Sequence, residues 1–246
     1  MKNISTNELV TSTELPAIVA ADNAADISEE YLEQRFSRPE KKPEVAVCEF
    51  TRDVGFLHQY HRLRQEPFIS QWGLGGLAGG MDDFDDSGDV IVARLGNHCV
   101  GGLRINYKTA EANLPLENIP CLSGVAQEPL PAGMIYAEIA RFAVLPEYQN
   151  SLMVMGELFQ EAFRHAADNN VKIAFILLPV MLSRQYNKLA RHSFEANWHL
   201  RPDIDIPITN DFGGTKMLMS MIDLTPIHDA RAGITTREEN LVAEVA

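Results

Sequence analysis

The stretch GGMDDFDDSGD, Gly79–Asp89, places five aspartates within eight residues, directly after a glycine-rich run. Carboxylates at this density suit four kinds of partner: a metal ion, a cationic group of a substrate, a set of arginines, or water. The sequence of the loop itself and of the rest of the chain distinguishes among these partners.

Calcium is the first partner to consider, because DFDDSG supplies Asp83, Asp85, Ser87 and Gly88 in the order D-x-D-x-S-G of an EF-hand loop. The twelfth position of such a loop holds a bidentate glutamate, but here it is Arg94. The following segment also has the pattern of a strand and not of a helix. The histidines and cysteines show no zinc spacing either, so no metal site is predicted.

The composition limits the classes of protein that fit. The chain has 246 residues, of which 46% are hydrophobic and 22% charged, so it can bury a core. The net charge of −13 argues against nucleic acid or an anionic membrane as the main partner. No apolar run is long enough to span a membrane, and the N-terminus lacks the pattern of a secretory signal. Three cysteines, with no C-x-x-C motif, favour a reducing cytoplasm.

Three regions are predicted along the chain. Residues 1–44 are interpreted as an N-terminal extension with one short helix, Ile27–Phe36, and a charged linker, Ser37–Glu44. Residues 45–225 form the ordered domain, and residues 226–246 are interpreted as a C-terminal tail.

Hydrophobic periodicity predicts the elements of the ordered domain. The expected strands are Val45–Phe50, a hairpin within Asp89–Tyr107 turning at Gly96 and Asn97, Met134–Val144, Val171–Leu178 and Lys216–Leu224. The expected helices are Asp53–Glu66, capped by Asp53 and ended by Pro67, then Leu152–Asn169 and Met181–Phe194. This order predicts a mixed α/β sheet between layers of helices, with a parallel crossover over residues 134–192.

Four segments in this order carry a family resemblance: HRLRQEPF (His61–Phe68), DDFD (Asp82–Asp85), GGLRI (Gly101–Ile105) and EIARFAV (Glu138–Val144). Together they resemble the acyl-homoserine-lactone (autoinducer) synthases and the long-chain N-acyl amino acid synthases of the GNAT acyltransferase superfamily. The resemblance implies a GNAT-like three-layer α/β/α fold. Its central sheet would be mixed, mostly antiparallel, and splayed at the acyl-donor site.

The resemblance also implies an acceptor site built on the aspartate loop. Its expected members are Arg64, Phe68, Trp72, Asp82, Phe84, Asp85 and Arg104. We expect Asp82 and Asp85 to pair with three arginines, Arg64, Arg104 and Arg141. Carboxylate oxygens with remaining hydrogen-bonding capacity would then bind the ammonium group of the acceptor. A purely structural ion cluster is the alternative. Asp83, Asp86 and Asp89 are interpreted as solvated.

Three departures from the family pattern concern the substrates. The autoinducer synthases carry a tryptophan at the place of Leu74, whereas Trp72 lies two residues earlier and a glycine-rich insertion covers 73–80. This favours the N-acyl amino acid synthase branch. GNAT acetyltransferases carry glycines that admit the coenzyme A pyrophosphate. In the corresponding QNSLMV those places hold Leu152 and Val154, so the resemblance implies acyl-acyl carrier protein as donor.

The implied reaction is aminolysis of a thioester, in which the acceptor amine must lose a proton. The resemblance makes Glu138 the candidate general base, acting through water, and places Arg141 beside it as a catalytic candidate. Tyr186 stands where many GNAT enzymes keep a tyrosine that protonates the leaving thiolate. A packing role for this tyrosine is the alternative.

The donor is expected to meet backbone groups like an added strand. The candidate donor-binding residues are Phe142, Ala143, Val144, Asn150 and Ser151. Arg184, Lys188 and Arg191 share one helix face and are the candidate docking site for the acidic carrier protein, with a solvated face as the alternative. A further set is either an acyl-chain cleft or ordinary core: Met153, Met155, Leu158, Phe159, Phe163, Phe175 and Leu177.

The sequence thus predicts an N-acyltransferase that needs no bound cofactor and uses acyl carrier protein or coenzyme A thioesters as co-substrate. The acceptor is the amine of an amino acid or of a similar molecule. The alternatives are an acyl-homoserine-lactone synthase using S-adenosylmethionine, an acetyl-coenzyme A-dependent N-acetyltransferase, and a non-catalytic acyl-carrier or lipid-binding module.

Overall fold

The computed structural model describes residues 46–71, 81–148, 152–193, 195–208 and 214–233. All of them belong to one compact unit, Lys42–Ala246. The predicted N-terminal extension 1–44, with its helix and linker, lies outside the described residues, as does the glycine-rich insertion 73–80.

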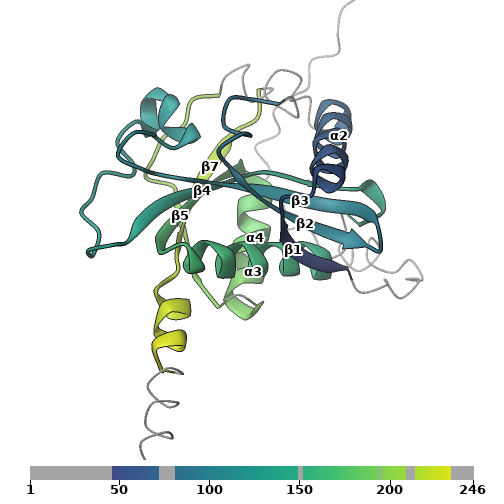
Figure 1. Ribbon diagram of the computed structural model, residues 1–246. Coiled ribbons are helices and arrows are strands. Elements are labelled where there is room, and N and C mark those ends of the chain that lie inside the picture. Colours follow the sequence, from purple (N-terminus) through teal and green to yellow (C-terminus); the bar gives the residue numbers. More distant parts are fainter. Residues whose placement is uncertain (1–45, 72–80, 149–151, 194, 209–213, 234–246) are drawn as a thin grey trace, which may run out of the picture. The chain divides into compact units, whose positions relative to one another are not determined.

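A seven-stranded mixed sheet in the order β1-β2-β3-β4-β5-β7-β6 forms the middle of the unit (Figure 1). The strands are β1 Val47–Thr51, β2 Asp89–Leu95, β3 His98–Tyr107, β4 Ile135–Val144, β5 Val171–Pro179, β6 Asn197–Arg201 and β7 Met217–Asp223. Only β4 and β5 pair in parallel; every other neighbouring pair is antiparallel. The mixed, mostly antiparallel sheet predicted from the sequence is therefore confirmed.

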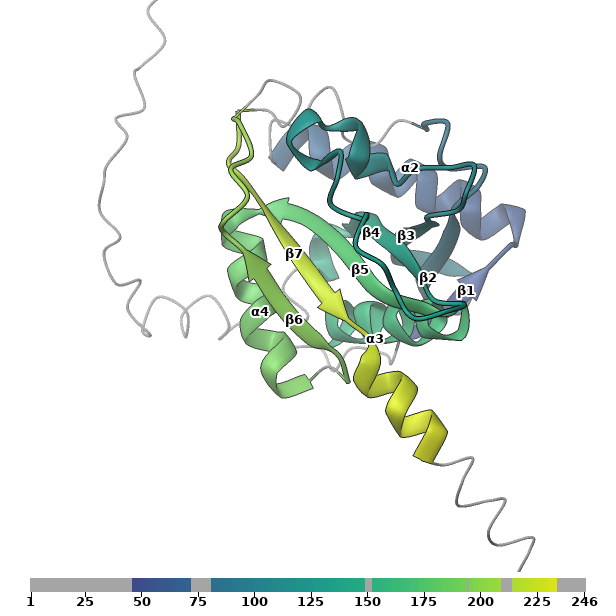
Figure 2. The ribbon, with the colours of Figure 1, turned by 90° about the vertical axis from the view of Figure 1, so that its left-hand side faces the viewer.

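Helices cover both faces of the sheet, so the three-layer α/β/α prediction is also confirmed. The helices are α2 Val54–Gln71, α3 Leu152–Asp168 and α4 Val180–Ser193, with 3-10 turns η1 Pro115–Asn118, η2 Pro120–Leu122 and η3 Pro146–Tyr148. Figure 2 shows α2 on one face and α3 and α4 on the other. On β2, Ile91 packs toward α3, while Val90 and Val92 pack toward α2, as the two-residue alternation of a strand requires.

Helix α2 begins as predicted but continues past its predicted end. The carboxylate of Asp53 accepts a hydrogen bond of 3.0 Å from the amide of Phe56, which confirms Asp53 as the cap. The prediction that Pro67 ends the helix is wrong, since α2 runs to Gln71. A proline removes one N–H from the helical ladder, and the residues beyond it can still pair their own amides. Tyr60 and Leu63 form the buried face of the helix.

Strand β6 was not predicted from the sequence. Its five residues, NWHLR, bury only Trp198 fully and leave Asn197 and His199 exposed. An edge strand this short shows no extended hydrophobic alternation, because one face and one edge lie open. It pairs with β7, from Asn197 opposite Asp223 to Arg201 opposite Met219.

The β4–α3–β5 segment is the predicted parallel crossover. Helix α3 buries Leu158, Phe159 and Phe163 completely, and this face packs on the sheet. Together with Ala162 and Ala166, which are also fully buried, these positions recur every three to four residues, which explains why the sequence predicts the helix well.

The sheet splays between its two parallel strands. The β4–β5 ladder covers Ile135–Glu138 of β4 and ends where Glu138 lies opposite Phe175. Beyond this point β4 continues beside β3, where Ala143 lies opposite Gly102. Strand β5 instead continues beside β7, through Pro179. The two strands therefore diverge after Glu138, at the position that the resemblance assigns to the acyl donor.

The chain after β7 is not wholly a tail. Residues 225–233 form a helix below the sheet in Figure 1, and Ile227 belongs to the core on the α3 side. Residues 234–246 lie outside the described part of the chain.

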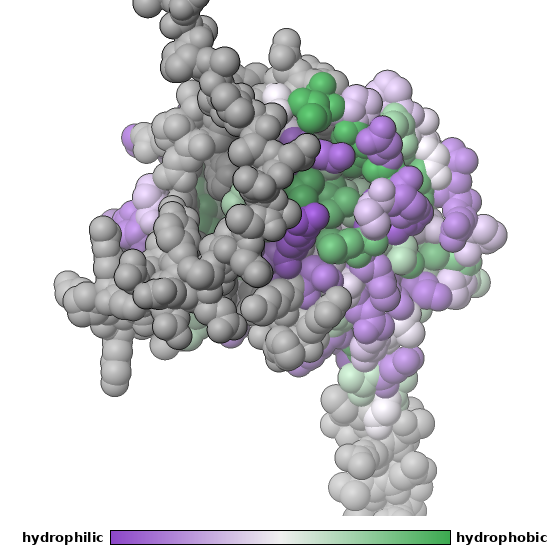
Figure 3. Space-filling view, turned by 180° about the vertical axis from the view of Figure 1, so that it is seen from behind, coloured by the Kyte–Doolittle hydropathy of each residue, from purple (hydrophilic) through white to green (hydrophobic). Residues whose placement is uncertain are grey.

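Hydrophobic side chains also reach the surface. On the face seen from behind, they gather in one part of the described surface and hydrophilic side chains lie around them (Figure 3). Across the described ranges, no helix combines the length and hydropathy needed to cross a membrane.

Candidate active site

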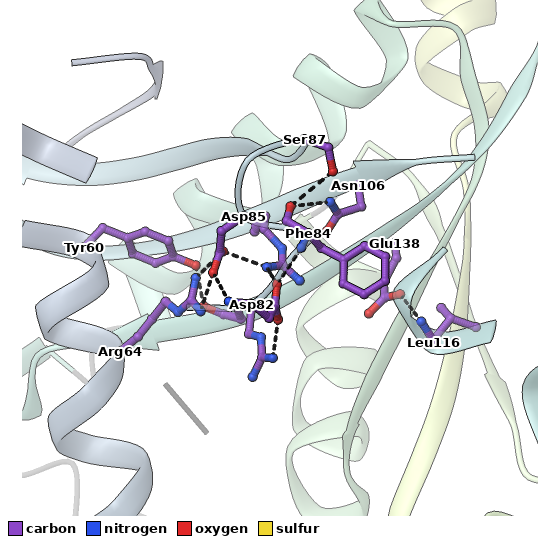
Figure 4. A network of polar contacts seen from close by, with 11 residues as sticks. Tyr60, Arg64, Asp82, Phe84, Asp85, Ser87, Asn106, Leu116 and Glu138 are labelled. Atoms are coloured by element: carbon purple, nitrogen blue, oxygen red, sulfur yellow. Dashed lines mark hydrogen bonds and ion pairs between the residues drawn. The ribbon is translucent and has the colours of Figure 1, made fainter. Parts of the chain in front are cut away.

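An ion network joins four elements on the α2 face of the sheet (Figure 4). Helix α2 contributes Arg64, β3 contributes Arg104, and β4 contributes Arg141. The loop before β2 contributes Asp82 and Asp85. The prediction that these five side chains come together is confirmed by this geometry.

Asp85 lies at the buried end of the network. Arg64 donates to both its oxygens, at 2.6 and 3.1 Å, and Nη1 of Arg104 lies 2.6 Å from Oδ1. The side chains of Arg64, Arg104 and Asp85 are each only 1% exposed. Two buried guanidinium groups therefore share one buried carboxylate, and that carboxylate is required to compensate their charge.

Asp82 lies at the open end. It accepts hydrogen bonds from Arg104 Nη1 at 2.6 Å and from Arg141 Nη2. The side chains of Asp82 and Arg141 are 25% and 22% exposed. A small polar molecule can therefore reach a carboxylate and a guanidinium group that lie next to each other.

The pKa values of both aspartates follow from these contacts. Burial alone raises the pKa of the Asp85 carboxyl, but hydrogen bonds from Arg64, from the Asp82 amide and from Arg104 outweigh it. The pKa of Asp85 therefore lies well below its ordinary value. The pKa of Asp82 is lowered in the same way, because hydrogen bonds from Arg104 and Arg141 outweigh burial. Both groups remain anionic wherever the protein is folded near neutral pH.

The aspartate loop is ordered by its own backbone. The Asp82 amide donates to Asp85 Oδ2 at 2.9 Å, and the Phe84 amide donates to Asp82 Oδ1 at 3.0 Å. Asn106 of β3 donates from Nδ2 to the Phe84 carbonyl at 2.9 Å. A Cβ on Gly88 would lie 2.7 Å from the Arg104 side chain, so only glycine lets the loop lie this close. Sequence reasoning missed Asn106, because a single asparagine in a strand carries no pattern.

A β-bulge in β4 orients the Arg141 side chain toward this loop. On β3, Gly102 pairs with Ala143 and Arg104 pairs with Ala140, which leaves Arg141 and Phe142 opposite one residue. Arg141 has a φ of 56°, in the left-handed region that a non-glycine residue rarely adopts. The hydroxyl of Tyr60 donates to the Arg141 carbonyl at 2.7 Å and stabilises the bulge. Periodicity marks Tyr60 as a core residue but gives no sign of this second role.

Glu138 lies on the same face of the sheet, where the β4–β5 ladder ends. It is 6% exposed, and its Oε2 accepts a hydrogen bond of 2.6 Å from the Leu116 amide in η1. Burial raises the pKa of Glu138 to about 7, although the Leu116 amide, Arg104 and Arg141 oppose the rise. In Figure 4 the side chain of Phe84 points from the loop toward Glu138.

Glu138 can therefore exchange a proton near neutral pH, as a general base must. The aspartates beside it stay charged and can hold a cationic group. The site thus combines a permanent anion, a partly open guanidinium group and a proton acceptor of near-neutral pKa on one face of the sheet. This combination suits proton removal from an ammonium group bound at the open end.

Tyr186 lies in an aromatic cluster beside the splayed strands. Its ring is 6.0 Å from that of Phe142 and 5.0 Å from that of Phe159. The tyrosine is 3% exposed, its hydroxyl contacts Met155 Sδ at 3.4 Å, and burial raises its pKa. These contacts favour the packing interpretation over proton donation to a thiolate.

Several predicted positions lie outside the described residues. They are the side chain of Phe68, Trp72, Asn150, Ser151, and the side chains of Lys188 and Arg191. Arg184, on α4, is exposed, as the predicted docking face requires. Phe142, Ala143 and Val144 lie on β4 beyond the end of its ladder with β5.

The interpretation of the remaining aspartates was right for two and wrong for one. Asp83 and Asp86 are exposed. Asp89 is 8% exposed and accepts a hydrogen bond of 2.8 Å from the Tyr107 hydroxyl; it also contacts Arg52 and, at 2.8 Å, His165 Nε2. The sequence gives no sign of this burial, because the partners of Asp89 come from three distant segments.

The hydrophobic set considered for an acyl-chain cleft divides between two faces. Met155, Leu158, Phe159 and Phe163 lie in the core on the α3 side. Phe175 and Leu177 belong to a second cluster with η1 and β7, and Met153 is 49% exposed. Most of the set is therefore core.

Two of three comparisons with known proteins found matches. Residues 73–192 match the family model of the N-acyl amino acid synthase FeeM. The fold is similar to that of the acyl-homoserine-lactone synthase LasI, with a TM-score of 0.54 and 17% identity over 73% of this chain and 90% of that chain. No curated protein sequence matches the chain significantly.

Two further solved structures share the fold. FeeM, from uncultured soil microbes, has a TM-score of 0.53 and 15% identity over 73% of this chain and 91% of that chain. The coenzyme A-dependent acyl-homoserine-lactone synthase BjaI, solved with SAM and isopentyl-CoA, has a TM-score of 0.53 and 16% identity over 69% of this chain and 76% of that chain. The resemblance predicted from the sequence, the GNAT-like fold and the acyltransferase class are confirmed.

Proposed function

We propose that this acyltransferase, similar to the N-acyl amino acid synthase FeeM, moves a fatty acyl group from a carrier thioester to the amine of an amino acid. The observation that carries the proposal is the buried Glu138. Its pKa is raised by burial to about 7, and it lies where β4 and β5 diverge, beside the ion network. A carboxyl group in this state can accept the proton of an attacking amine.

The acceptor is proposed to bind at the open end of the network. An amino acid carries an ammonium and a carboxylate on one carbon, and Asp82 and Arg141 present the complementary charges next to each other. Both groups are already paired, so the acceptor would share their remaining hydrogen-bonding capacity rather than replace the pair. An acceptor without a carboxylate would use only half of this arrangement.

The donor is proposed to lie along β4 after Glu138. The amide groups of a pantetheine arm can pair with an extended backbone, and the divergence of β4 from β5 supports room for such an arm. The residues at 152 and 154 are leucine and valine, which supports a carrier-protein thioester over one that carries a pyrophosphate. A coenzyme A thioester remains the alternative donor, because BjaI is a coenzyme A-dependent synthase of similar fold.

The proposed chemistry is a single acyl transfer. Glu138, through a water molecule, accepts one proton of the bound ammonium group, and the resulting neutral amine attacks the thioester carbon. The C–N bond forms, the C–S bond breaks, and the second proton that the nitrogen loses goes to the leaving thiolate. Arg141, beside the attack site, stabilises the negative charge that develops on the substrate.

Carrier protein is proposed to dock on α4. Arg184 is exposed there, and Lys188 and Arg191 follow at spacings that place all three on one helix face. This positive face on an acidic chain would attract an acidic carrier, with an affinity that falls as salt rises. We propose the cytoplasm as the compartment, since Cys48, Cys99 and Cys121 are free.

Glu138→Gln tests the assignment of the base. We expect acyl transfer to fall by about 10²-fold or more while binding of the acyl thioester is retained. Glu157→Gln, an exposed change on α3, serves as the matched control and should leave transfer unaltered. Release of free thiol from acyl-carrier substrate measures turnover, and full activity of the Glu138→Gln protein would remove this residue from the mechanism.

A lactone-forming enzyme is the second candidate. The fold it shares with LasI and BjaI supports it, whereas the position of Trp72 in the sequence favours the amino acid acceptor. Supplying S-adenosylmethionine in place of a panel of amino acids separates the two candidates, because only a lactone synthase would release acyl-homoserine lactone.

A further inference from the structure

An ion pair outside the network connects the loop between β3 and β4 to the sheet. Lys108 directly follows β3, and its amide donates to the Tyr136 carbonyl of β4 at 2.9 Å. Its Nζ lies 2.6 Å from Oε1 of Glu117, which belongs to η1. The Glu117 side chain is only 3% exposed, and that of Lys108 is 22% exposed.

The second oxygen of Glu117 fixes the backbone of η1. Oε2 of Glu117 accepts a hydrogen bond of 2.9 Å from the Leu114 amide, and the Glu117 amide donates back to the Leu114 carbonyl at 3.0 Å. Glu117 thus closes the first turn of η1 from both sides, as a capping box does. Between these two residues lies Leu116, whose amide donates to Glu138 at 2.6 Å.

One continuous set of contacts therefore runs from Lys108 through Glu117 and the η1 backbone to Glu138. We propose that Glu117 and Lys108 are positioning residues for Glu138, which hold the Leu116 amide against its carboxylate. This inference rests on the proposed role of Glu138 as the base. Within the described part of the chain, the ion pair contacts no residue assigned to the acceptor or the donor, so its effect on the reaction is indirect.

A charge-assisted hydrogen bond from an amide favours the carboxylate form. It opposes burial, which alone favours the protonated form. The other charged groups around Glu138 come from different elements: Arg104 from β3, Arg141 from β4 and Asp82 from the loop before β2. Loss of the ion pair leaves these three in place. We therefore expect only the hydrogen bond from the Leu116 amide to weaken. Its loss raises the pH at which Glu138 titrates.

The hydrophobic anchors of η1 give the competing explanation. Leu114 and Leu116 are 0% and 2% exposed and pack with Phe175 and Met219. If these contacts alone hold the turn, breaking the ion pair would change stability without moving the titration of Glu138. The two explanations differ in the pH profile.

The experiment uses the full chain with Glu117→Ala and Lys108→Met, and follows two quantities. One is the titration of the Glu138 carboxyl by carbon NMR; the other is kcat/KM for acyl transfer between pH 5 and 9. We expect both midpoints to rise by about one pH unit, so that activity drops about tenfold below the midpoint and is retained at high pH. Lys108→Arg, which keeps the charge, should restore the midpoints of the original protein.

Glu49→Gln is the matched control, because it removes the Glu49–Arg94 ion pair between β1 and β2, away from η1. It should move neither midpoint. Lys108→Met carries the test if Glu117→Ala does not fold, since Lys108 is the more exposed partner. An unmoved Glu138 titration, or an equal loss of activity at every pH, would overturn the inference. Full activity of Glu138→Gln would instead overturn the base assignment, while the NMR titration still tests the positioning role.

Discussion

Three carboxylates on one face of the sheet differ in pKa because their donors differ. Asp85 receives two guanidinium groups and a backbone amide, and these outweigh its burial. Asp82 receives Arg104 and Arg141. Glu138 is 6% exposed and, among the described residues, receives a direct hydrogen bond from the Leu116 amide alone, so burial dominates. Environments that separate pKa values in this way assign permanent charge to the aspartates and proton exchange to the glutamate.

Because the pKa of Glu138 is raised in the folded protein, we expect the free energy of unfolding to decrease at high pH. Its folded pKa is about 7, against an ordinary value of 4.5, so the folded protein binds the extra proton between these values. The stabilising contribution is complete below pH 4.5 and is lost as pH rises through 7, a change of about 3 kcal/mol. Urea unfolding at pH 5 and pH 8 measures it.

Glu138→Gln isolates this contribution, because glutamine does not titrate. We expect the original protein to lose about 2 to 3 kcal/mol more than the variant between the two pH values. Equal pH dependence of the two proteins would mean that the pKa of Glu138 is not raised.

We expect the substitution Asp85→Asn to cause a large loss of stability. The change removes the carboxylate that Arg64 and Arg104, both 1% exposed, share, and Arg104 then keeps only its pair with the partly exposed Asp82. We expect the free energy of unfolding at pH 7 to fall by about 3 to 5 kcal/mol. Asp83→Asn, at an exposed neighbour in the same loop, is the control and should change it by less than about 0.5 kcal/mol.

The pH dependence of the network has the opposite sign to that of Glu138. Because the pKa of Asp85 is depressed, its stabilising contribution is present above the ordinary pKa of an aspartate and is lost as pH falls below it. Asp85→Asn should therefore cost less at pH 3 than at pH 7. An undiminished cost at pH 3 would contradict the charge-based explanation.

At the scale of elements, the geometry of the site depends on how α2 packs against the sheet. Tyr60 is fully buried and reaches the bulge carbonyl of Arg141, and Gly102 on β3 leaves space for its ring. A Cβ on Gly102 would lie 2.7 Å from Tyr60 Cδ2 and 2.9 Å from the Ile91 carbonyl. The glycine thus fixes the distance between the helix that carries Arg64 and the strand that carries Arg104.

Gly102→Ala is expected to destabilise the protein by about 1 to 3 kcal/mol, because the Tyr60 ring has to move. Gly156→Ala in α3 meets nothing within 4 Å and should stabilise by about 0.5 to 1 kcal/mol through helix propensity. Thermal unfolding of both variants gives the comparison, and a neutral Gly102→Ala would show that α2 can shift without cost.

The sequence predicts those elements and residues that repeat with a period or that match a family motif. Strand β4 and helix α3 follow from periodicity, and Arg64, Asp82 and Asp85 from the resemblance. Contacts between unlike segments carry no such signal. The Tyr60–Arg141 bond, the Leu116 amide and the partners of Asp89 arise only when the chain is folded.

At the scale of the molecule, two features meet at Glu138. The parallel ladder ends there, and the ion network lies on the same face of the sheet. A donor that follows β4 and an acceptor at Asp82 would therefore approach the same carboxyl group from different directions. Under the proposed function, the thioester and the amine would therefore meet at Glu138, where the sheet splays.

Mass spectrometry of lipid extracts from cells that overproduce the protein tests this claim most directly, with cells producing Glu138→Gln as the comparison. We expect N-acyl amino acids to accumulate with the original protein and to fall by about 10²-fold with the variant. Acyl-homoserine lactones, no new N-acylated product, or equal amounts of product from both proteins would contradict the account.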